Sequence, residues 1–472
     1  MKRFFIMLII ICSIGIYAQN SSLDTINGCE VLNVWGSNYE MGYGHGYALN
    51  SRIPEFFIDY LFNGLGLSVT AYNFIYSNFW NDFTVPDLYC EEAGAVIDGI
   101  EGSGSSIYID TLGRDLDSTD ILIANAIVDI DFLYSKSKKG AFGCSSLSAW
   151  GRPTESDSLI RGNIIMARNL DYSHTDNMLA NAMIMTFDPD SANEWLCFSY
   201  PGIITPLSGM NSDMTVTEVN VGYHRNNTNY SPAFTPFLIS QRMILETGDY
   251  DGNDSIDFRD AFTLCKEHNN PGSWLCHTIK PYADSAHISA AVIECPNESA
   301  DTFRLSIDDH NFYPYYLLML NHEEVNYTRP PEDPRYQEVL DSVNSDSIMT
   351  SVKMWSIMTS VSNYNTIQTM LFLPNDSLFF ISFADPSNNA SYIYPSRFKW
   401  SDLFPNHQQS GVNSSMHSDK NYTRIMHIDQ LSQIIRTGSD IYTPDGRKLT
   451  APRPGIIFIL HNKKFMKFIV ID

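Results

Sequence analysis

The spacing of apolar residues predicts a mostly helical segment from about Cys29 to Phe142. Apolar residues recur three and four positions apart through Phe56–Leu65 and again through Ile121–Tyr134. This is the spacing of a helix with one buried face. We therefore expect residues 19–143 to form a helical N-terminal segment.

The pattern changes after Cys144, where short apolar runs are separated by Gly, Pro, Asp and Asn. Such runs predict strands. The clearest are Leu159–Ala167, Met183–Phe187 and Trp195–Tyr200. Helical runs at Pro236–Thr247 and Arg259–His268 then alternate with strands to about Phe404. The order helices, strands, helices, strands predicts an α+β fold with residues 144–404 as its core, in which two sheets lie between helices.

The last part of the chain has a different composition. His407–Asn421 is rich in Ser, Asn and Gln, which is typical of a linker. Ile441–Val470 is a compact run of short strands with turns at Pro444, Asp445, Gly446 and at Pro454, Gly455. We expect a linker over residues 405–438 and a small β module over residues 439–472.

The first residues have the pattern of an export signal. Lys2 and Arg3 precede the apolar run Phe4–Tyr17, and Ala18 stands where a signal peptidase requires a small residue. Residues 1–18 are therefore a predicted signal peptide. The bulky Ile11 disfavours lipoprotein processing at Cys12. No later stretch reaches the roughly 18 uninterrupted apolar residues of a spanning helix, so no transmembrane segment is expected.

Composition limits the partners. The chain has 472 residues, 44% hydrophobic and 18% charged, which is enough apolar material for a sizeable core. Its 54 acidic and 30 basic residues give a formal net charge of -24. Such a charge repels nucleic acid phosphates and anionic lipid headgroups. We expect a small-molecule substrate and no nucleic acid.

The cysteines of the sequence do not decide whether the chain contains disulfides. Removal of Cys12 with the signal leaves an odd set, so at least one thiol is unpaired within the chain. The others are either disulfide-bonded or buried thiols. The set is Cys29, Cys90, Cys144, Cys197, Cys265, Cys276 and Cys295.

The candidate chemistry is concentrated around Cys144. In GCSSLSAWG the thiol follows Gly143, where the backbone adopts turns that a side chain forbids. The later string GNIIMARNLDY predicts a strand ending in Arg168, Asn169 and Asp171, in a hairpin with the strand that Cys144 opens. Such a hairpin returns a cation and a carboxylate to the thiol. Taken alone, these residues favour a packed core thiol and a surface ion pair at a strand end.

Several motifs together resemble a known family. GCSSLSAWG and ARNLDY are accompanied upstream by GSNYEMGYGHG and EEAGAVIDGIEG, and downstream by YPGIITPLSGMN, VTEVN, AAVIE, LNH and NTIQTMLFLPNDSLFFIS. This series resembles the acyl-coenzyme A:6-aminopenicillanic acid acyltransferase family, the isopenicillin-N acyltransferase or carcinine hydrolase group of N-terminal-nucleophile hydrolases. The resemblance covers about Val31 to Phe383 and implies a four-layer αββα sandwich.

The resemblance also implies roles for individual residues. Cys144 is the expected nucleophile and its freed α-amine the general base, with Arg168 and Asp171 holding and polarising them. A terminal amine suits this task because its unperturbed pKa is about 8. Asn220 and Asn321 match positions that supply oxyanion-hole and amine-positioning hydrogen bonds, and Arg335 matches the arginine that completes such sites.

A second candidate site is the acidic string DYDGNDSIDFRD. Its spacing is similar to that of an EF-hand or dockerin loop, whose oxygen ligands suit Ca2+. The candidate ligands are Asp249, Asp251, Asn253, Ser255, Asp257 and Asp260. Asp254 stands where a glycine favours the sharp turn, so an ordinary acidic connection between helices is the alternative.

The C-terminal string IYTPDGRKLTAPRPGIIFILHNKKFMKFIVI resembles the sorting domains of the type IX secretion system of Bacteroidetes. The resemblance implies recognition by that machinery and an extracellular, secreted or surface-attached protein. A terminal hairpin of the main domain is the alternative.

These observations predict a secreted cysteine amidohydrolase or acyltransferase that cuts itself before Cys144 and then cleaves a linear amide of a small N-acylated substrate. No cofactor is expected for catalysis, because a thiol, an amine and hydrogen bonds supply the chemistry. Hydrolysis is favoured over transfer because water is abundant outside a cell and coenzyme A is not. Two alternatives stay open: a phospholipase B-like or ceramidase-like lipid amidase, and a catalytically dead surface-displayed binding protein.

Overall fold

The chain divides into two compact units, Met1–Pro405 and Asn406–Asp472. The computed structural model describes residues 20–134, 142–222, 234–246, 248–253, 257–282, 288–296, 301–308, 311–312, 314–322, 333–345 and 348–404, and the backbone of four strands between 423 and 471. The predicted signal peptide, most of the predicted linker and Ser255 lie outside these residues.

The larger sheet of the first unit has nine strands among the described residues, in the order β1-β2-β7-β8-β9-β10-β11-β12-β13. The β2–β7 pair is parallel, and the other neighbours are antiparallel. The strands are β1 (Ser21–Ile26), β2 (Cys29–Gly36), β7 (Met183–Pro189), β8 (Trp195–Ser199), β9 (Ser208–Asn211), β10 (Val216–Val221), β11 (Trp274–Ile279), β12 (Ala290–Cys295) and β13 (Thr302–Arg304).

The second sheet has six antiparallel strands among the described residues, in the order β14-β5-β6-β15-β16-β17. They are β5 (Phe142–Ala149), β6 (Ile165–Tyr172), β14 (Tyr316–Met319), β15 (Thr366–Leu373), β16 (Leu378–Phe383) and β17 (Ser396–Lys399). A two-stranded ribbon, β3 (Tyr108–Ile109) with β4 (Arg114–Asp115), lies outside both sheets.

Helices connect the strands. The α-helices are α1 (Asn38–Ala48), α2 (Arg52–Ile58), α3 (Val69–Asp82), α4 (Asp87–Gly102), α5 (Ser118–Tyr134), α6 (Asp176–Ala180), α7 (Phe237–Glu246), α8 (Phe258–Glu267), α9 (Pro334–Ser345), α10 (Ser351–Ser360) and α11 (Trp400–Leu403). A π-helix, Asp59–Gly64, continues α2, and short 3₁₀ turns occur at Arg152–Thr154, Pro374–Asp376 and Ala390–Tyr392.

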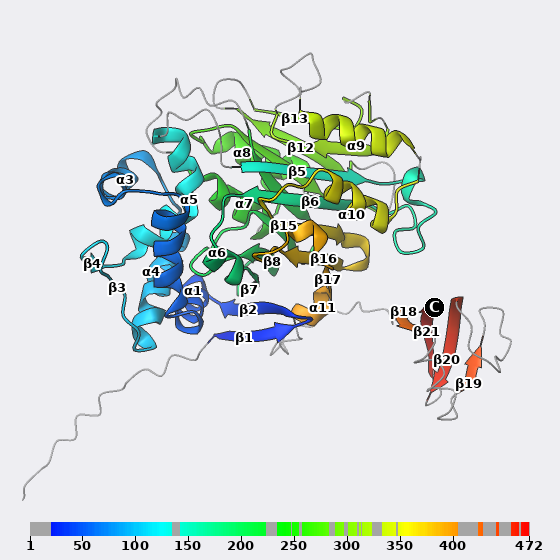
Figure 1. Ribbon diagram of the computed structural model, residues 1–472, viewed down its shortest axis with the longest axis horizontal. Helices are drawn as coiled ribbons and strands as arrows, with labels where there is room; N and C mark the ends of the chain where they lie inside the picture. Colours follow the sequence, from blue (N-terminus) through cyan, green and yellow to red (C-terminus); the bar gives the residue numbers. More distant parts are fainter. Residues whose placement is uncertain are drawn as a thin grey trace, which may run out of the picture. The chain divides into compact units, whose positions relative to one another are not determined.

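The two sheets pack face to face. Apolar side chains such as Ile184 and Leu196 of the larger sheet share one buried cluster with Met370 and Phe379 of the smaller sheet. The outer face of the larger sheet packs against α1 to α5, α7 and α8, while α9 and α10 cover the outer face of the smaller sheet. Figure 1 shows α1 to α5 gathered at one side and α9 and α10 at another. The predicted mixed α/β architecture with large sheets is confirmed.

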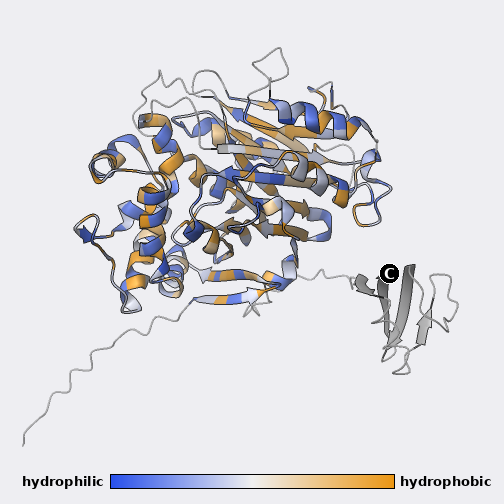
Figure 2. Cartoon of the chain, viewed as in Figure 1, coloured by the Kyte–Doolittle hydropathy of each residue, from blue (hydrophilic) through white to orange (hydrophobic). Residues whose placement is uncertain are grey.

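The hydropathy of the N-terminal helices reflects their burial. Figure 2 shows apolar residues interleaved with hydrophilic ones along these helices. Helix α5 is enclosed over most of its length, since its residues from Thr119 to Ile130 are all buried. A helix that is buried on nearly all sides forms the centre of a core rather than its surface.

Two predicted elements differ from the structure. The N-terminal segment is not only helical, because Ser21–Ile26 and Cys29–Gly36 form two strands of the larger sheet. The predicted strand Leu159–Ala167 begins only at Ile165. Before it the chain turns at Arg161 and Gly162, both with positive φ. That backbone conformation ends a strand.

Among its described residues, the second unit holds a four-stranded sheet, in the order β18-β21-β20-β19. Its strands are β18 (Thr423–His427), β19 (Asp440–Tyr442), β20 (Gly455–His461) and β21 (Lys464–Ile471). β18 runs parallel to β21. Because β18 lies within the stretch predicted as a linker, this sheet begins earlier in the chain than residue 439.

No helix in the described ranges is both long enough and apolar enough to cross a membrane.

Candidate active site

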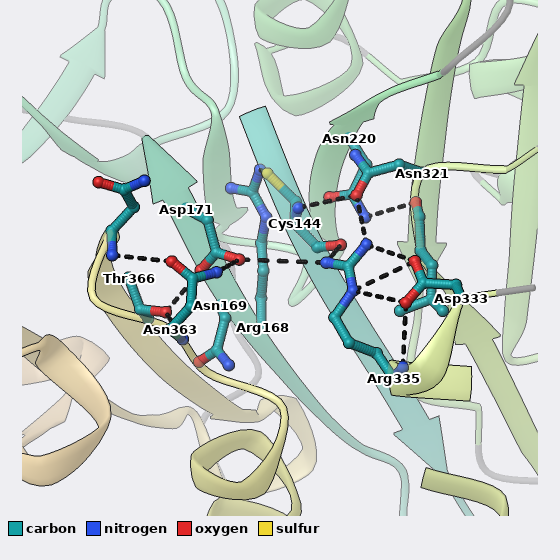
Figure 3. A network of polar contacts seen from close by, with 12 residues as sticks. Cys144, Arg168, Asn169, Asp171, Asn220, Asn321, Asp333, Arg335, Asn363 and Thr366 are labelled. Atoms are coloured by element: carbon teal, nitrogen blue, oxygen red, sulfur yellow. Dashed lines mark hydrogen bonds and ion pairs between the residues drawn. The ribbon is translucent and has the colours of Figure 1, made fainter. Parts of the chain in front are cut away.

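Cys144 lies on β5, directly opposite β6. The two strands are antiparallel, with Cys144 paired to Leu170 and Gly143 paired to Asp171. The hairpin relation that the sequence predicted is therefore present. Residues that face each other across antiparallel strands project from the same face. The hairpin thus brings side chains from the end of β6 to the start of β5 (Figure 3). Cys144 is only 1% exposed there.

The thiol of Cys144 is held by a buried arginine. Nη2 of Arg168 donates to Sγ of Cys144 at 3.6 Å and also to the carbonyl of Val219. Nη1 donates to the carbonyl of Leu207 at 3.0 Å and to the hydroxyl of Ser208. These three further partners fix the guanidinium, so its charge stays beside the sulfur.

The charges around Cys144 oppose the effect of burial. Burial raises the pKa of the thiol, the positive charge of Arg168 lowers this pKa, and the negative charge of Asp171 raises it. The net shift is upward. A thiol in this state needs a base before it becomes a nucleophile.

The backbone of Cys144 is held as firmly as its side chain. Its N–H donates to Oδ1 of Asn321 at 3.0 Å, and its carbonyl accepts from Nη1 of Arg335 at 3.0 Å. Nη2 of Arg335 also donates to Oδ1 of Asn321 at 2.9 Å. One amide oxygen thus joins the nitrogen of Cys144 to the first turn of α9.

Asp171 lies beside the residue that precedes the nucleophile. It accepts from the Thr366 hydroxyl at 2.6 Å and from Nδ2 of Asn363 at 2.7 Å, and Nη1 of Arg335 is 4.0 Å from its Oδ2. A Cβ added at Gly143 would lie 3.2 Å from Oδ2, so glycine is the residue that leaves this carboxylate undisturbed. Burial raises the pKa of Asp171 to about 6.

Asn220 is close to this group but does not bond to Cys144. Its Nδ2 donates to the carbonyls of Leu320 at 2.9 Å and of Met319 at 3.3 Å, next to Asn321. Its buried Oδ1 has no hydrogen-bond partner in the described part of the chain. The expected oxyanion-hole role of Asn220 stays a prediction.

Sequence reasoning missed three residues of the site. The carboxylate of Asp333 accepts two hydrogen bonds from Nε of Arg335, at 3.0 and 3.2 Å, and a third from Nη2 at 2.7 Å. Bonds with Arg335 and His322 hold the pKa of Asp333 well below its usual range, although burial acts against them. The signal for Asp333 was its position two residues before Arg335. Asn363 and Thr366 had no local signal, because strand pairing places Thr366 beside Asp171 and Asn363 reaches Asp171 from the loop before β15.

No imidazole contacts the thiol among the described residues. His277 lies between the sheets, where its ring nitrogens are 2.8 Å from the hydroxyl of Ser146 and 2.9 Å from that of Ser148. Burial lowers the pKa of His277 to about 3, so its ring is neutral. A cysteine–histidine pair is therefore not the catalytic arrangement of these residues.

The acidic loop before α8 brings some of the predicted calcium ligands close together. Carboxylate oxygens of Asp249, Asp251 and Asp260 lie within 4.8 Å of one another. Asp257 is directed elsewhere, since it caps α8 and pairs with Arg259 at 2.6 Å. Asn253 donates its Nδ2 to Asp251. The calcium site stays a prediction, centred on the three carboxylates that converge.

Calcium is expected to raise the melting temperature of the protein if this loop binds it. A ligand that binds only the folded state adds about 2.7 kcal/mol at a free concentration one hundred times its Kd. Thermal unfolding in millimolar Ca2+ and in chelator measures the shift. The double variant Asp249→Asn, Asp251→Asn should not respond. Identical melting curves for the unmodified protein in both solutions would remove the site.

Comparisons with known proteins give limited similarity. No family model matches the chain, and no curated protein matches it. Part of the chain is similar to a solved N-acylethanolamine-hydrolyzing acid amidase ortholog of Caenorhabditis elegans, with 15% identity, a TM-score of 0.36, and 54% of this chain and 99% of that chain covered.

Two further solved structures are similar to about half of the chain. Penicillin V acylase from Agrobacterium tumefaciens has 10% identity and a TM-score of 0.32, covering 51% of this chain and 83% of that one. A mutant of conjugated bile acid hydrolase from Clostridium perfringens has 11% identity and a TM-score of 0.30, covering 54% of this chain and 97% of that one. The assignment of the site rests on its own geometry.

Proposed function

We propose that this protein is an N-terminal-nucleophile amidohydrolase of four-layer αββα architecture that cuts itself before Cys144 and then hydrolyses a linear amide. The carrying observation is that the thiol, the nitrogen and the carbonyl of Cys144 are each bonded by a different predicted site residue, namely Arg168, Asn321 and Arg335. A structural thiol needs none of these contacts.

Self-cleavage begins from the thiol. Sγ of Cys144 attacks the carbonyl carbon of Gly143, the peptide C–N bond breaks, and the nitrogen takes a proton to become an α-amine. The resulting thioester is hydrolysed by water, which leaves a carboxylate on Gly143 and returns the thiol. The nitrogen that leaves is the one that Asn321 already holds at 3.0 Å.

Turnover uses the new amine as the base. The thiol proton passes to the α-amine of Cys144, and Sγ attacks the carbonyl carbon of the substrate amide. Asn220 and a backbone N–H are the proposed donors to the oxyanion. The leaving amine takes the proton back, and water releases the acyl group from sulfur. These steps use protein groups and water, so cofactor-free catalysis is part of the proposal.

The buried and bonded state of the site favours an enzyme over a dead scaffold. Arg168 is fully buried and places its charge beside the thiol, an arrangement that has a use in catalysis and none in binding at the protein surface. The apolar surroundings of Leu170 and Tyr172 keep the lipid amidase as the second candidate function.

We further propose that residues 1–18 direct export and that the C-terminal unit is the module read by the type IX secretion machinery. Its separate four-stranded sheet supports a separable module. Normal secretion of a chain that ends at Phe404 in the native host would contradict this role.

The pH–rate profile tests the function. The base must be an unprotonated amine, with an unperturbed pKa of about 8, and Asp171 must be ionised, with a pKa of about 6. Activity is therefore expected to fall as the pH falls. A plot of the logarithm of kcat/KM against pH should have a slope of one between the two pKa values. Below the lower pKa the slope should approach two.

The matched variant is Asp171→Asn, measured over the same pH range. It should lose most of the rate and keep a slope of one at low pH, because only the amine remains to be protonated. A profile that is the same in both proteins would show that Asp171 does not titrate in the active site.

A further inference from the structure

We propose that the apolar pocket beside Leu170 is the acyl-binding site and that the substrate carries an uncharged, apolar acyl group. This inference rests on the proposed function and specifies its substrate class. The pocket is a partly open apolar hollow, and its roughly 510 Å³ of empty space includes open solvent. Its walls include Phe56, Tyr60, Val128, Leu170, Leu238 and Ile367.

The pocket adjoins the nucleophile through β6. Leu170, which lines it, is the strand partner of Cys144. Arg168 bridges the two places, because it donates to Sγ of Cys144 and to the carbonyl of Leu207, another lining residue. Cys144 does not itself line the pocket, so we place the acyl group against Leu170, with its carbonyl carbon directed to the neighbouring sulfur.

A bulge in β15 completes the wall. The register of β15 against β6 shifts between Thr366 and Gln368, which leaves Ile367 as the extra residue. A bulge redirects a side chain without breaking the sheet. Thr366 keeps its hydrogen bond to Asp171 while Ile367 lines the pocket, so the polar and apolar parts of the site are built from neighbouring residues.

The polar atoms of the wall are already bonded to the protein. Asn125 donates to the carbonyls of Ile121 and Gly202 at 2.8 and 3.1 Å. Its Oδ1 accepts from the N–H of Ile204 and the hydroxyl of Thr205. The amide of Asn125 therefore offers little to a polar substrate group.

The aromatic hydroxyls of the wall also stay neutral. Tyr172 donates to Tyr60 at 3.4 Å, and burial raises the pKa of Tyr60 to about 12. No Asp, Glu, Lys, Arg or His lines the pocket within the described part of the chain. A charged acyl group would lose its hydration here and find no counter-ion, which is strongly unfavourable. Acyl groups that carry an amine or a second carboxylate are therefore excluded.

Both proposed fragments build the pocket. Phe56, Tyr60 and Val128 precede the cleavage point, whereas Leu170 and Leu238 follow it. The light chain, residues 19–143, must remain bound after cleavage because it supplies part of the acyl wall. His45 of the same segment accepts from the N–H of Gly202 at 3.0 Å and so fixes the loop between the lining residues Tyr200 and Ile203.

The test uses the full-length, self-cleaved protein with acyl derivatives of one fluorogenic amine, 7-amino-4-methylcoumarin. Acetyl, hexanoyl, octanoyl and phenylacetyl derivatives are compared with β-alanyl and succinyl derivatives. We expect kcat/KM to rise up to about fourfold for each buried methylene and the charged acyl groups to react at least a hundredfold more slowly than octanoyl. Equal or faster hydrolysis of the charged derivatives would overturn the pocket assignment.

Two pocket variants give opposite changes and so separate specificity from general destabilisation. Ala124→Leu adds volume inside the pocket and should shift the preference to shorter acyl chains, whereas Leu238→Ala should shift it to longer ones. A shift in the same direction, or none, contradicts the assignment. Labelling of Cys144 by an acylating probe separates failure of the pocket assignment from failure of the proposed function. If Cys144 is labelled but the enzyme has no acyl preference, only the pocket assignment is wrong. If Cys144 is unlabelled and the protein is inactive, both the pocket assignment and the proposed function are wrong.

Discussion

Replacing Cys144 with alanine is expected to leave one uncut and inactive chain. While Cys144 is in mid-chain its nitrogen is an amide without basicity, so the proposed base does not exist before the bond to Gly143 breaks. The unmodified protein should give two fragments, about Gln19 to Gly143 and a heavy chain that begins at Cys144. Mass measurement and N-terminal sequencing of the purified protein detect both.

Two variants control this experiment. Cys144→Ser is expected to cut slowly, because a hydroxyl performs the same acyl shift less readily than a thiol. Cys197→Ala removes another fully buried thiol from the same apolar cluster and should cut normally. Full activity of the uncut wild-type chain, or a heavy chain that begins at another residue, would refute the N-terminal-nucleophile assignment.

The parts of the site that are close in sequence were predictable, and those joined by distant strand pairing were not. Arg168 and Asp171 follow Cys144 by one hairpin, so a local pattern of two strands was enough to bring them together. Asn321 and Arg335 were found only through the family resemblance. Their contacts with the backbone of Cys144 depend on β14 and α9, whose positions no local pattern encodes.

The N-terminal strands illustrate the same limit for the fold. β2 pairs in parallel with β7, which lies about 150 residues later in the chain. Parallel pairing of strands so distant in sequence is decided by burial on both faces rather than by local spacing. The helical periodicity of the segment that follows therefore dominated the prediction, and Cys29–Gly36 was included in a helical region.

The pocket could not be seen in the sequence because its walls come from six separated stretches, around Phe56, Val128, Leu170, Tyr200, Leu238 and Ile367. Each stretch has an ordinary apolar pattern that predicts core packing. Which of these residues fill the core and which line a cavity is decided only when the light-chain helices pack on the sheets.

Arg242→Leu is expected to cause the largest loss of stability in the first unit. The guanidinium of Arg242 is fully buried, pairs with Glu92 at 2.6 Å and Glu246 at 2.7 Å, and lies over the ring of Tyr89. Removing it leaves two buried carboxylates without a cation. The free energy of unfolding should fall by about 3–5 kcal/mol at neutral pH.

The pH dependence of this loss has a definite sign. Burial already raises the pKa of Glu92, and Arg242 acts to lower it. Without Arg242 the folded-state pKa of Glu92 rises further above its unfolded value, so the folded variant binds more protons than the unfolded one in that range. Its stability should therefore decrease as the pH rises through this window and partly recover in mild acid.

Arg161→Leu is the matched control, because Arg161 pairs with Asp376 at the same 2.7 Å but its side chain is 56% exposed. An exposed pair contributes about 0–1 kcal/mol, so denaturant unfolding should barely change.

In the cut protein, Glu92 belongs to the light chain and Arg242 to the heavy chain. Arg242→Leu should therefore also weaken the association of the light and heavy chains, which gel filtration measures. Equal stability of the Arg242 and Arg161 variants, with the two fragments still associated, would show that this buried pair does not hold the fragments together.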